Sequence, residues 1–217
     1  MTAIGQQVLR WCDAWNRNHR WDHNAHYHRR ILRQLPAHAD RGLDVGCGTG
    51  ELARRVAPHV RQLDGLDVDD AVIATARRLT PDSLSIQYAQ GDLLTADLRR
   101  RYGAITAVAV LHRMPLEPAL QRLRDLLAPG GTLVVLGVYR QLTPTDHLIS
   151  TAALPANLLM GAVKTRGHTA AKPVAMTART ASTSTSLAQI RSAAMKIVQG
   201  AIIRRHLFRE NRVLTLD

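Results

Sequence analysis

The chain has 217 residues, of which 46% are hydrophobic and 21% charged, and its formal net charge is +12. This composition excludes a wholly disordered chain, and the length suits one domain of moderate size. No apolar run is long enough to span a membrane, and two cysteines are too few for a disulfide framework. The N-terminus has no secretory-signal pattern, so we expect a cytoplasmic, reduced protein.

The positive charge is unevenly distributed along the chain. The formal balance is +4 over residues 1–43, +1 over residues 44–140 and +7 over residues 141–217. An excess on both flanks favours an anionic partner. Nearly all of the basic residues are Arg, however, and GC-rich coding produces such a bias without any function. The sequence leaves both interpretations open.

Apolar residues at helical spacing predict an N-terminal helical cap over residues 1–40. One helix face carries Ile4, Val8, Trp11 and Trp15. A polar, His-rich stretch follows at residues 20–28. A second helix around Ile31 and Leu35 is expected to stop at Pro36.

Between residues 41 and 140, short apolar strands alternate with amphipathic helices. Strands are expected at 43–45, 61–67, 85–89, 104–111 and 132–138. Helices are expected at 51–57, 71–79 and 117–127, the second of them capped by Asp69 or Asp70. The fourth strand is almost wholly apolar, which suits a parallel strand buried on both faces. This alternation predicts a Rossmann-like α/β core with a doubly wound, mostly parallel sheet of about seven strands.

The C-terminal part of the same domain, residues 141–217, is less regular. A helix is expected at 146–160, and residues 161–186, which contain no acidic residue, are expected to form a flexible segment. Ser186 and Gln189 fit a capping box that opens a helix reaching about residue 198. Two closing strands are expected at 201–208 and 213–216.

The first chemical motif is the glycine-rich turn Leu-Asp-Val-Gly-Cys-Gly-Thr-Gly at residues 43–50. Its glycines leave no Cβ where the backbone turns tightly and where a ligand can approach closely. The spacing is Gly-x-Gly-x-Gly, unlike the Gly-x-Gly-x-x-Gly of dinucleotide-binding turns, and Glu51 would repel a phosphate at the following helix. Asp44, just before the turn, can accept a hydrogen bond from an ammonium group or from bound water.

Two further carboxylates follow the next two expected strands. Asp67 ends the second strand, where a carboxylate can accept hydrogen bonds from ribose hydroxyls. Asp92 ends the third strand, where it can accept from an adenine amino group. Strand-end capping is the alternative role for both residues.

These segments together resemble the class I S-adenosylmethionine-dependent methyltransferases, in a small-molecule branch. The segments that match the family's motifs are 43–50, 65–67, 91–93, 110–112, 126–133 and, in the N-terminal cap, 21–24 and 27–28. The chain departs from the family's pattern at Gly103, where Asp is frequent, and at Arg113, which replaces the second His of a His-His pair. Gln199 also stands where related chains tend to carry Pro.

The resemblance implies that the chain binds S-adenosylmethionine. Gly46 and Gly48 would pass beneath its methionine part, with Tyr27 and His28 of the cap nearby. Asp67 would hold the ribose and Asp92 the adenine. The full set of implied cofactor-binding residues is Tyr27, Asp44, Gly46, Cys47, Gly48, Asp67, Val68, Asp92, Leu93, Ala107 and Val108.

His112 is the candidate catalytic base, because it follows the fourth strand at the sheet edge where ligands bind in such folds. A structural hydrogen bond is its alternative role. Arg113 either holds an acceptor carboxylate or phosphate, or remains solvated. His19, His23 and His26 can share one helix face, but they lack the tighter spacing of zinc sites, and we expect no metal.

The sequence therefore predicts methyl transfer to oxygen, nitrogen or carbon of a small-molecule acceptor, and the charge favours an anionic one. A nucleic-acid methyltransferase is one alternative. Against it, Leu111–Met114 occupies the place of the Asn/Asp-Pro-Pro-aromatic motif of amino-methylating enzymes, and no aromatic residues interleave the basic flanks. A non-catalytic cofactor-binding protein is another alternative. The acceptor and the oligomeric state are not readable from the sequence.

Overall fold

The computed structural model describes residues 23–139, 163, 185–198, 200–205 and 211–216. The strands are β1 (Ala39–Val45), β2 (Val60–Asp67), β3 (Ile86–Gln90), β4 (Tyr102–Val108), β5 (Leu127–Val138), β6 (Ile202–Arg205) and β7 (Asn211–Leu216). The α-helices are α2 (His23–Leu32), α3 (Glu51–Val56), α4 (Asp70–Leu79), α5 (Leu116–Leu126) and α7 (Leu187–Ile197). Short 3₁₀ turns are η1 (Ala57–His59) and η2 (Leu111–Arg113).

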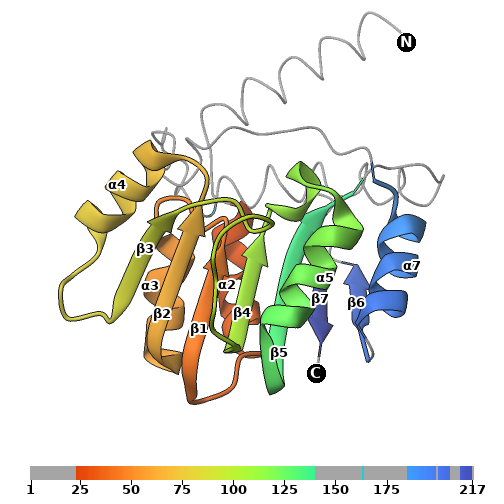
Figure 1. Ribbon diagram of the computed structural model, residues 1–217, viewed down its shortest axis with the longest axis horizontal. Helices are drawn as coiled ribbons and strands as arrows, with labels where there is room; N and C mark the ends of the chain where they lie inside the picture. The colour runs from red at the N-terminus through yellow and green to blue at the C-terminus, as the bar shows by residue number, and fades with distance from the viewer. Residues whose placement is uncertain (1–22, 140–162, 164–184, 199, 206–210, 217) are drawn as a thin grey trace, which may run out of the picture.

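The seven strands form one sheet in the order β3-β2-β1-β4-β5-β7-β6 (Figure 1). Strands β1 to β5 are parallel, β7 runs antiparallel to β5, and β6 runs antiparallel to β7. The chain winds from β1 outward through β2 to β3, then returns to β4 on the other side of β1. The predicted doubly wound, mostly parallel sheet is therefore confirmed.

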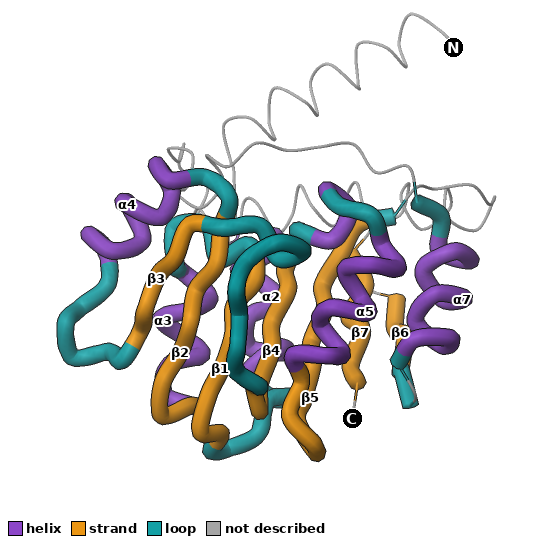
Figure 2. The backbone as a smooth tube through the Cα atoms, in the orientation of Figure 1, coloured by secondary structure: helices purple, strands orange, loops and turns teal. Residues whose placement is uncertain are grey.

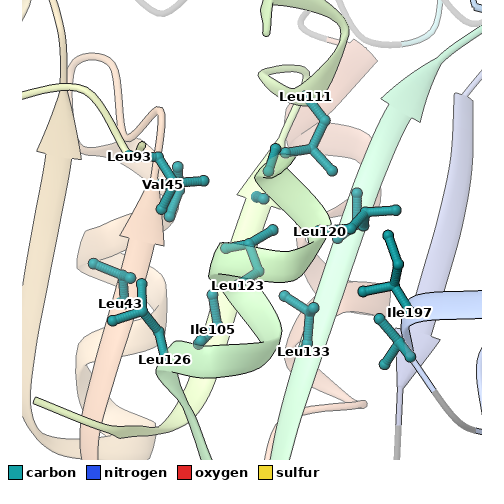
Figure 3. Close-up of a cluster of buried hydrophobic side chains, with 14 of the residues drawn as sticks. Leu43, Val45, Leu93, Ile105, Leu111, Leu120, Leu123, Leu126, Leu133 and Ile197 are labelled. Atoms are coloured by element: carbon teal, nitrogen blue, oxygen red, sulfur yellow. The ribbon is translucent and has the colours of Figure 1, made fainter. Parts of the chain in front are cut away.

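Helices cover both faces of this sheet, with α5 in front and α2 and α3 behind in Figure 1. Successive strand residues pack into opposite cores, because side chains alternate along a strand. In β4, Ile105 lies in the core that α5 and α7 complete, whereas Ala104 lies in the core that α2, α3 and α4 complete. Figure 3 shows the first of these cores, where Leu120 and Leu123 of α5 lie near Leu133 of β5.

Two helix starts agree with their predicted caps. The Asp69 carboxylate accepts a hydrogen bond from the Ala71 N–H at the start of α4. Ser186 and Gln189 form the reciprocal capping box at the start of α7. Side chains that satisfy the first free N–H groups stabilise a helix locally, which is why both signals can be read from sequence.

Several predicted boundaries were wrong, among them the start of β1, which lies at Ala39 and not at residue 43. Strand β4 ends at Val108 and not at residue 111, because Ala109 adopts a positive φ of 53° and turns the chain away. Helix α2 begins at His23, within the polar, His-rich stretch, and ends at Leu32, before the stop predicted at Pro36. Strand β5 begins at Leu127 and not at residue 132, and its pairing with β4 shifts register at Tyr102.

Several predictions fall outside the described residues. They are the helix through Ile4 and Trp15, the helix at 146–160 and nearly all of the segment 161–186. Of the predicted cap, only residues 23–40 can therefore be described, and the division near residues 40 and 140 stays a prediction. Within the part of the chain that the structure describes, no helix is long and apolar enough to cross a membrane.

Candidate functional site

The site lies at the carboxyl edge of the parallel strands, between β1 and β4. These two strands are neighbours, and the connections that leave them run to opposite sides of the sheet. In open α/β sheets, ligands bind in the crevice at such a switch point. The loop of residues 46–50 after β1 and the loop of residues 109–113 after β4 flank this position (Figure 2).

Gly46 is where the two loops meet. Its φ is +69°, and its N–H donates to the Leu66 carbonyl at 2.7 Å. A Cβ at this position would lie 2.7 Å from both Cβ and Cγ2 of Val110. Ala109, which follows β4 and directly precedes Val110 in the chain, also has a positive φ. Glycine is therefore required at position 46 both for the backbone conformation and for the close approach of Val110.

Gly48 faces open space. Its φ is +52°, and no described atom lies within 4 Å of the position that a Cβ would occupy. Its N–H donates to Oδ2 of Asp67 at 2.9 Å, which fixes the loop to the end of β2. A ligand can therefore approach this part of the loop backbone without displacing a described side chain.

Asp67 is half-buried and links two segments of the site. While Oδ2 accepts from Gly48, Oδ1 accepts from the Asp69 N–H at 3.1 Å. Each carboxylate oxygen has two lone-pair positions, so both oxygens can accept one further hydrogen bond. The structural capping role and a ligand-binding role for Asp67 are therefore compatible.

Asp44 is a buried carboxylate with one unsatisfied oxygen. The residue is 2% exposed, and its Oδ1 accepts from the Thr106 hydroxyl at 2.7 Å. Its Oδ2 is buried without a hydrogen-bond partner among the described residues. Burial, reinforced by the Asp67 charge, raises the pKa of Asp44 to about 7 against the lowering effect of Thr106. Such an oxygen calls for a cationic or donor group from a ligand.

Tyr27 and Cys47 pack in the same buried cluster, on the face of the sheet that α2 covers. Burial, together with the charges of Asp44 and Asp67, raises the pKa of the Cys47 thiol, so it stays protonated and is a poor nucleophile. His28 is also buried, with Nδ1 3.9 Å from Oε1 of Glu51 at the start of α3. The cap helix α2 is thus anchored beside the glycine loop.

The remaining predicted cofactor residues differ in exposure. Val68 is 53% exposed next to Asp67, and Asp92 is exposed with Oδ1 accepting from the Leu94 N–H at 2.8 Å. Leu93 is 1% exposed and its side chain packs in the α5-side core. Ala107 is fully buried and Val108 half-buried at the end of β4. All of these residues lie at or near the carboxyl ends of β2, β3 and β4.

His112 lies in η2, in the loop on the β4 side of the site. Its imidazole is half-buried, and Nδ1 is buried without a hydrogen-bond partner in the described part of the chain. Burial and the neighbouring Arg113 charge lower the pKa of His112, so the ring is neutral at pH 7. A neutral imidazole retains one nitrogen that can accept a proton.

Sequence reasoning missed Thr106 and Val110. Thr106 is the one residue of β4 with an aliphatic hydroxyl, and it lies opposite Asp44 in the β1–β4 register. A polar residue inside an otherwise apolar strand was the available signal. Val110 belongs to the matched segment 110–112, but its contact with Gly46 could not be predicted, because it depends on the turn at Ala109. Among the described residues, no group of three or more His, Cys, Asp or Glu side chains is arranged to hold a metal ion.

Comparisons with known proteins agree with this geometry. Residues 43–131 match the family model of a methyltransferase domain. An uncharacterised methyltransferase of Mycobacterium tuberculosis is 34% identical over 118 residues, which cover 54% of this chain and 59% of that protein. The trans-aconitate 2-methyltransferase of Methylobacterium radiotolerans is 33% identical over 127 residues, 57% of this chain and 48% of that protein. The chain thus spans about half of the length of the curated relatives it matches.

Among solved structures, the N-methyltransferase NodS of Bradyrhizobium japonicum in complex with S-adenosylhomocysteine superposes with a TM-score of 0.58. The alignment covers 94% of this chain and 95% of NodS at 18% identity, and a likeness at that identity concerns the fold. The family match and the relatives confirm the resemblance to methyltransferases that the sequence motifs indicated. Over residues 43–131, the chain is therefore similar to methyltransferase domains.

Proposed function

We propose that the chain binds S-adenosylmethionine at the carboxyl edge of β1, β2 and β4 and transfers its methyl group to a small-molecule acceptor. The observation that carries this proposal is the joint placement of Asp44, Gly48 and Asp67. An unsatisfied buried carboxylate oxygen, an open stretch of glycine backbone and a carboxylate with free lone pairs occur within one loop and its neighbouring strand end.

The residues present fit the parts of this cofactor. Asp44 would accept from the ammonium group, directly or through one water, and Asp67 from the ribose hydroxyls. The open side of Gly48 would receive the methionine part, while Asp92 and the exposed Val68 would lie beside the adenine. The residues proposed to complete the cofactor's surroundings are Tyr27, Gly46, Cys47, Leu93, Ala107 and Val108.

S-adenosylmethionine supplies a methyl group on a sulfonium, which is a good leaving group for in-line displacement. The protein then contributes mainly proximity and orientation. His112, neutral at pH 7, would accept a proton from an acceptor hydroxyl or ammonium group. Its position after β4 places it across the switch point from the glycine loop. We therefore assign His112 the role of base, with methylation at oxygen or nitrogen favoured over carbon.

The acceptor is proposed to be small and anionic. Arg113 lies next to His112 and would pair with a carboxylate or phosphate. The name of the Methylobacterium relative describes action on trans-aconitate, which is a small anion. Leu111–Met114 replaces the motif of amino-methylating nucleic-acid enzymes, which disfavours that alternative. We also propose a cytoplasmic location, where the cofactor is made.

Cofactor binding is tested by isothermal titration calorimetry with S-adenosylhomocysteine. The wild-type chain should bind, and Asp67→Ala should weaken binding by about tenfold or more, because a charge-assisted hydrogen bond contributes about 1.5–3 kcal/mol. Asp82→Ala is the matched control, since Asp82 is exposed in the loop between α4 and β3. Absence of binding at millimolar ligand would refute the proposed function.

The role of His112 is tested once an acceptor is found by screening metabolites for cofactor-dependent methylation. His112→Ala should lower kcat by about 10²-fold or more while leaving the affinity for S-adenosylhomocysteine unchanged. His38→Ala, at an exposed position before β1, is the control. Unchanged turnover in His112→Ala would exclude the base role.

A further inference from the structure

The pair formed by Asp44 and Thr106 has a geometry that cofactor binding alone does not explain. Leu43 and Val45 pack into the α5-side core, so Asp44 between them points to the opposite face of the sheet. Ile105 and Ala107 likewise leave Thr106 on that opposite face. The two residues are paired in register across β1 and β4, and their side chains meet at 2.7 Å.

This hydrogen bond distinguishes the two oxygens of the carboxyl group. Oδ1 accepts from the Thr106 hydroxyl, whereas Oδ2 is buried without a partner among the described residues. A bare negative charge at such an oxygen is costly in a buried site. In the free protein, a proton on Oδ2 would neutralise this charge. A cation bound next to Oδ2 would instead stabilise the charged carboxylate.

We propose that Thr106 positions Asp44 so that Oδ2 holds a proton in the free protein and releases it to solvent when the ammonium group of the cofactor docks. The inference rests on the proposed function. The O–H bond of Asp44 breaks, the proton goes to solvent, and the carboxylate that remains pairs with the ammonium group. Thr106 acts through Asp44 and is a positioning residue.

The groups around Asp44 are consistent with this exchange. The Asp67 charge disfavours a second negative charge and so favours the proton. Cys47 and Tyr88 remain neutral, since burial raises the pKa of both and the Asp44 charge raises them further. On the α2 side, Tyr27 and His28 are buried on the same face of the sheet. The Thr106 hydroxyl occupies Oδ1 and so leaves Oδ2 as the site for the proton, while its hydrogen bond lowers the pKa of Asp44 and thereby limits the rise that burial causes.

The test is calorimetry with S-adenosylhomocysteine in buffers of different ionisation enthalpy, from pH 5.5 to pH 8. The wild-type chain should release about one proton at pH 6 and almost none at pH 8, and the binding constant should rise by about tenfold per pH unit below pH 7. Asp44→Asn should release no proton and bind with an affinity that does not change with pH. Proton release by Asp44→Asn equal to the wild type would overturn the inference.

Thr106→Val removes the hydroxyl at nearly constant volume. The binding constant for S-adenosylhomocysteine should then stop rising at a higher pH than in the wild type, because the pKa of Asp44 is higher without the hydrogen bond. Thr106→Ser retains the hydroxyl and should follow the wild type. A purely structural role would weaken binding equally at every pH, so a Thr106→Val profile parallel to the wild type would overturn the positioning role.

A second ligand separates the ammonium group from the nucleoside. 5′-Methylthioadenosine carries the same nucleoside without an amino acid part, and its binding should release no proton. Release with this ligand as well would show that the ammonium group is not the trigger. If neither ligand binds at millimolar concentration, the proposed function fails and this inference falls with it. If S-adenosylhomocysteine binds the wild-type chain at pH 6 without proton release, this inference is refuted while the proposed function stands.

Discussion

Alanine at Gly46 should destabilise the fold more than alanine at Gly48, whereas alanine at Gly48 should still weaken ligand binding. Both glycines have positive φ values, +69° and +52°, so both substitutions meet the left-handed conformation that costs an L-residue about 1–2 kcal/mol. At Gly46 the new methyl group would also lie 2.7 Å from Val110, and overpacking of this kind costs about 1–3 kcal/mol. At Gly48 no described atom lies within 4 Å.

Gly46→Ala should therefore lower the free energy of unfolding by about 2–5 kcal/mol, and Gly48→Ala by about 1–2 kcal/mol. The stiffening of the unfolded chain by Ala acts equally in both variants and cancels in their comparison. Urea unfolding of the ligand-free protein, followed by circular dichroism, measures both values. The less destabilised Gly48→Ala should nevertheless lose affinity for S-adenosylhomocysteine, because its methyl group enters the open side of the loop.

If Gly46→Ala is no more destabilised than Gly48→Ala, the contact between Val110 and the glycine loop does not constrain the fold. Gly46→Ala combined with Val110→Gly gives a further check, because the double variant removes the steric overlap and should be less destabilised than the sum of the single changes.

Two other substitutions test local electrostatics and capping. Because the pKa of Asp44 is raised to about 7 in the folded protein, the wild type should lose stability relative to Asp44→Asn as pH rises from 4 to 7, by about 1.4 kcal/mol per pH unit in the middle of that window. Urea unfolding at several pH values measures the difference, and parallel curves for the two proteins would contradict the raised pKa. Ser186→Ala should cost about 1 kcal/mol by breaking the capping box with Gln189. Ser186→Asp should retain most of that stability, and equal stability of the Ala variant and the wild type would show that the box contributes nothing.

Local signals in the sequence were sufficient for much of the fold. The cap of α4 at Asp69 and the capping box of α7 act within a few residues, so both could be read directly. The apolar pattern predicted each parallel strand of the core. The end of β4 could not be read, because the apolar run continues to residue 111 while the turn depends on the backbone at Ala109.

The candidate site shows the same distinction between local and distant causes. Asp44, Gly48 and Asp67 were singled out from motifs, and the structure joins Gly48 to Asp67 by a hydrogen bond across 19 positions. The bond between Thr106 and Asp44 spans 62 positions and depends on the register of β1 against β4. Register between strands that are not consecutive in the chain is a tertiary property, so a single sequence gave no means of pairing these two residues.

The contact of Val110 with Gly46 also limits how the protein can be engineered. The loop after β4 carries His112 and Arg113, which we propose to face the acceptor, and is therefore the natural target for libraries that seek new acceptors. Its first residues, however, form one wall of the donor-side glycine loop. A library that keeps Ala109 and Val110 and varies the positions from His112 onwards should yield more variants that retain cofactor affinity than one that randomises the whole loop.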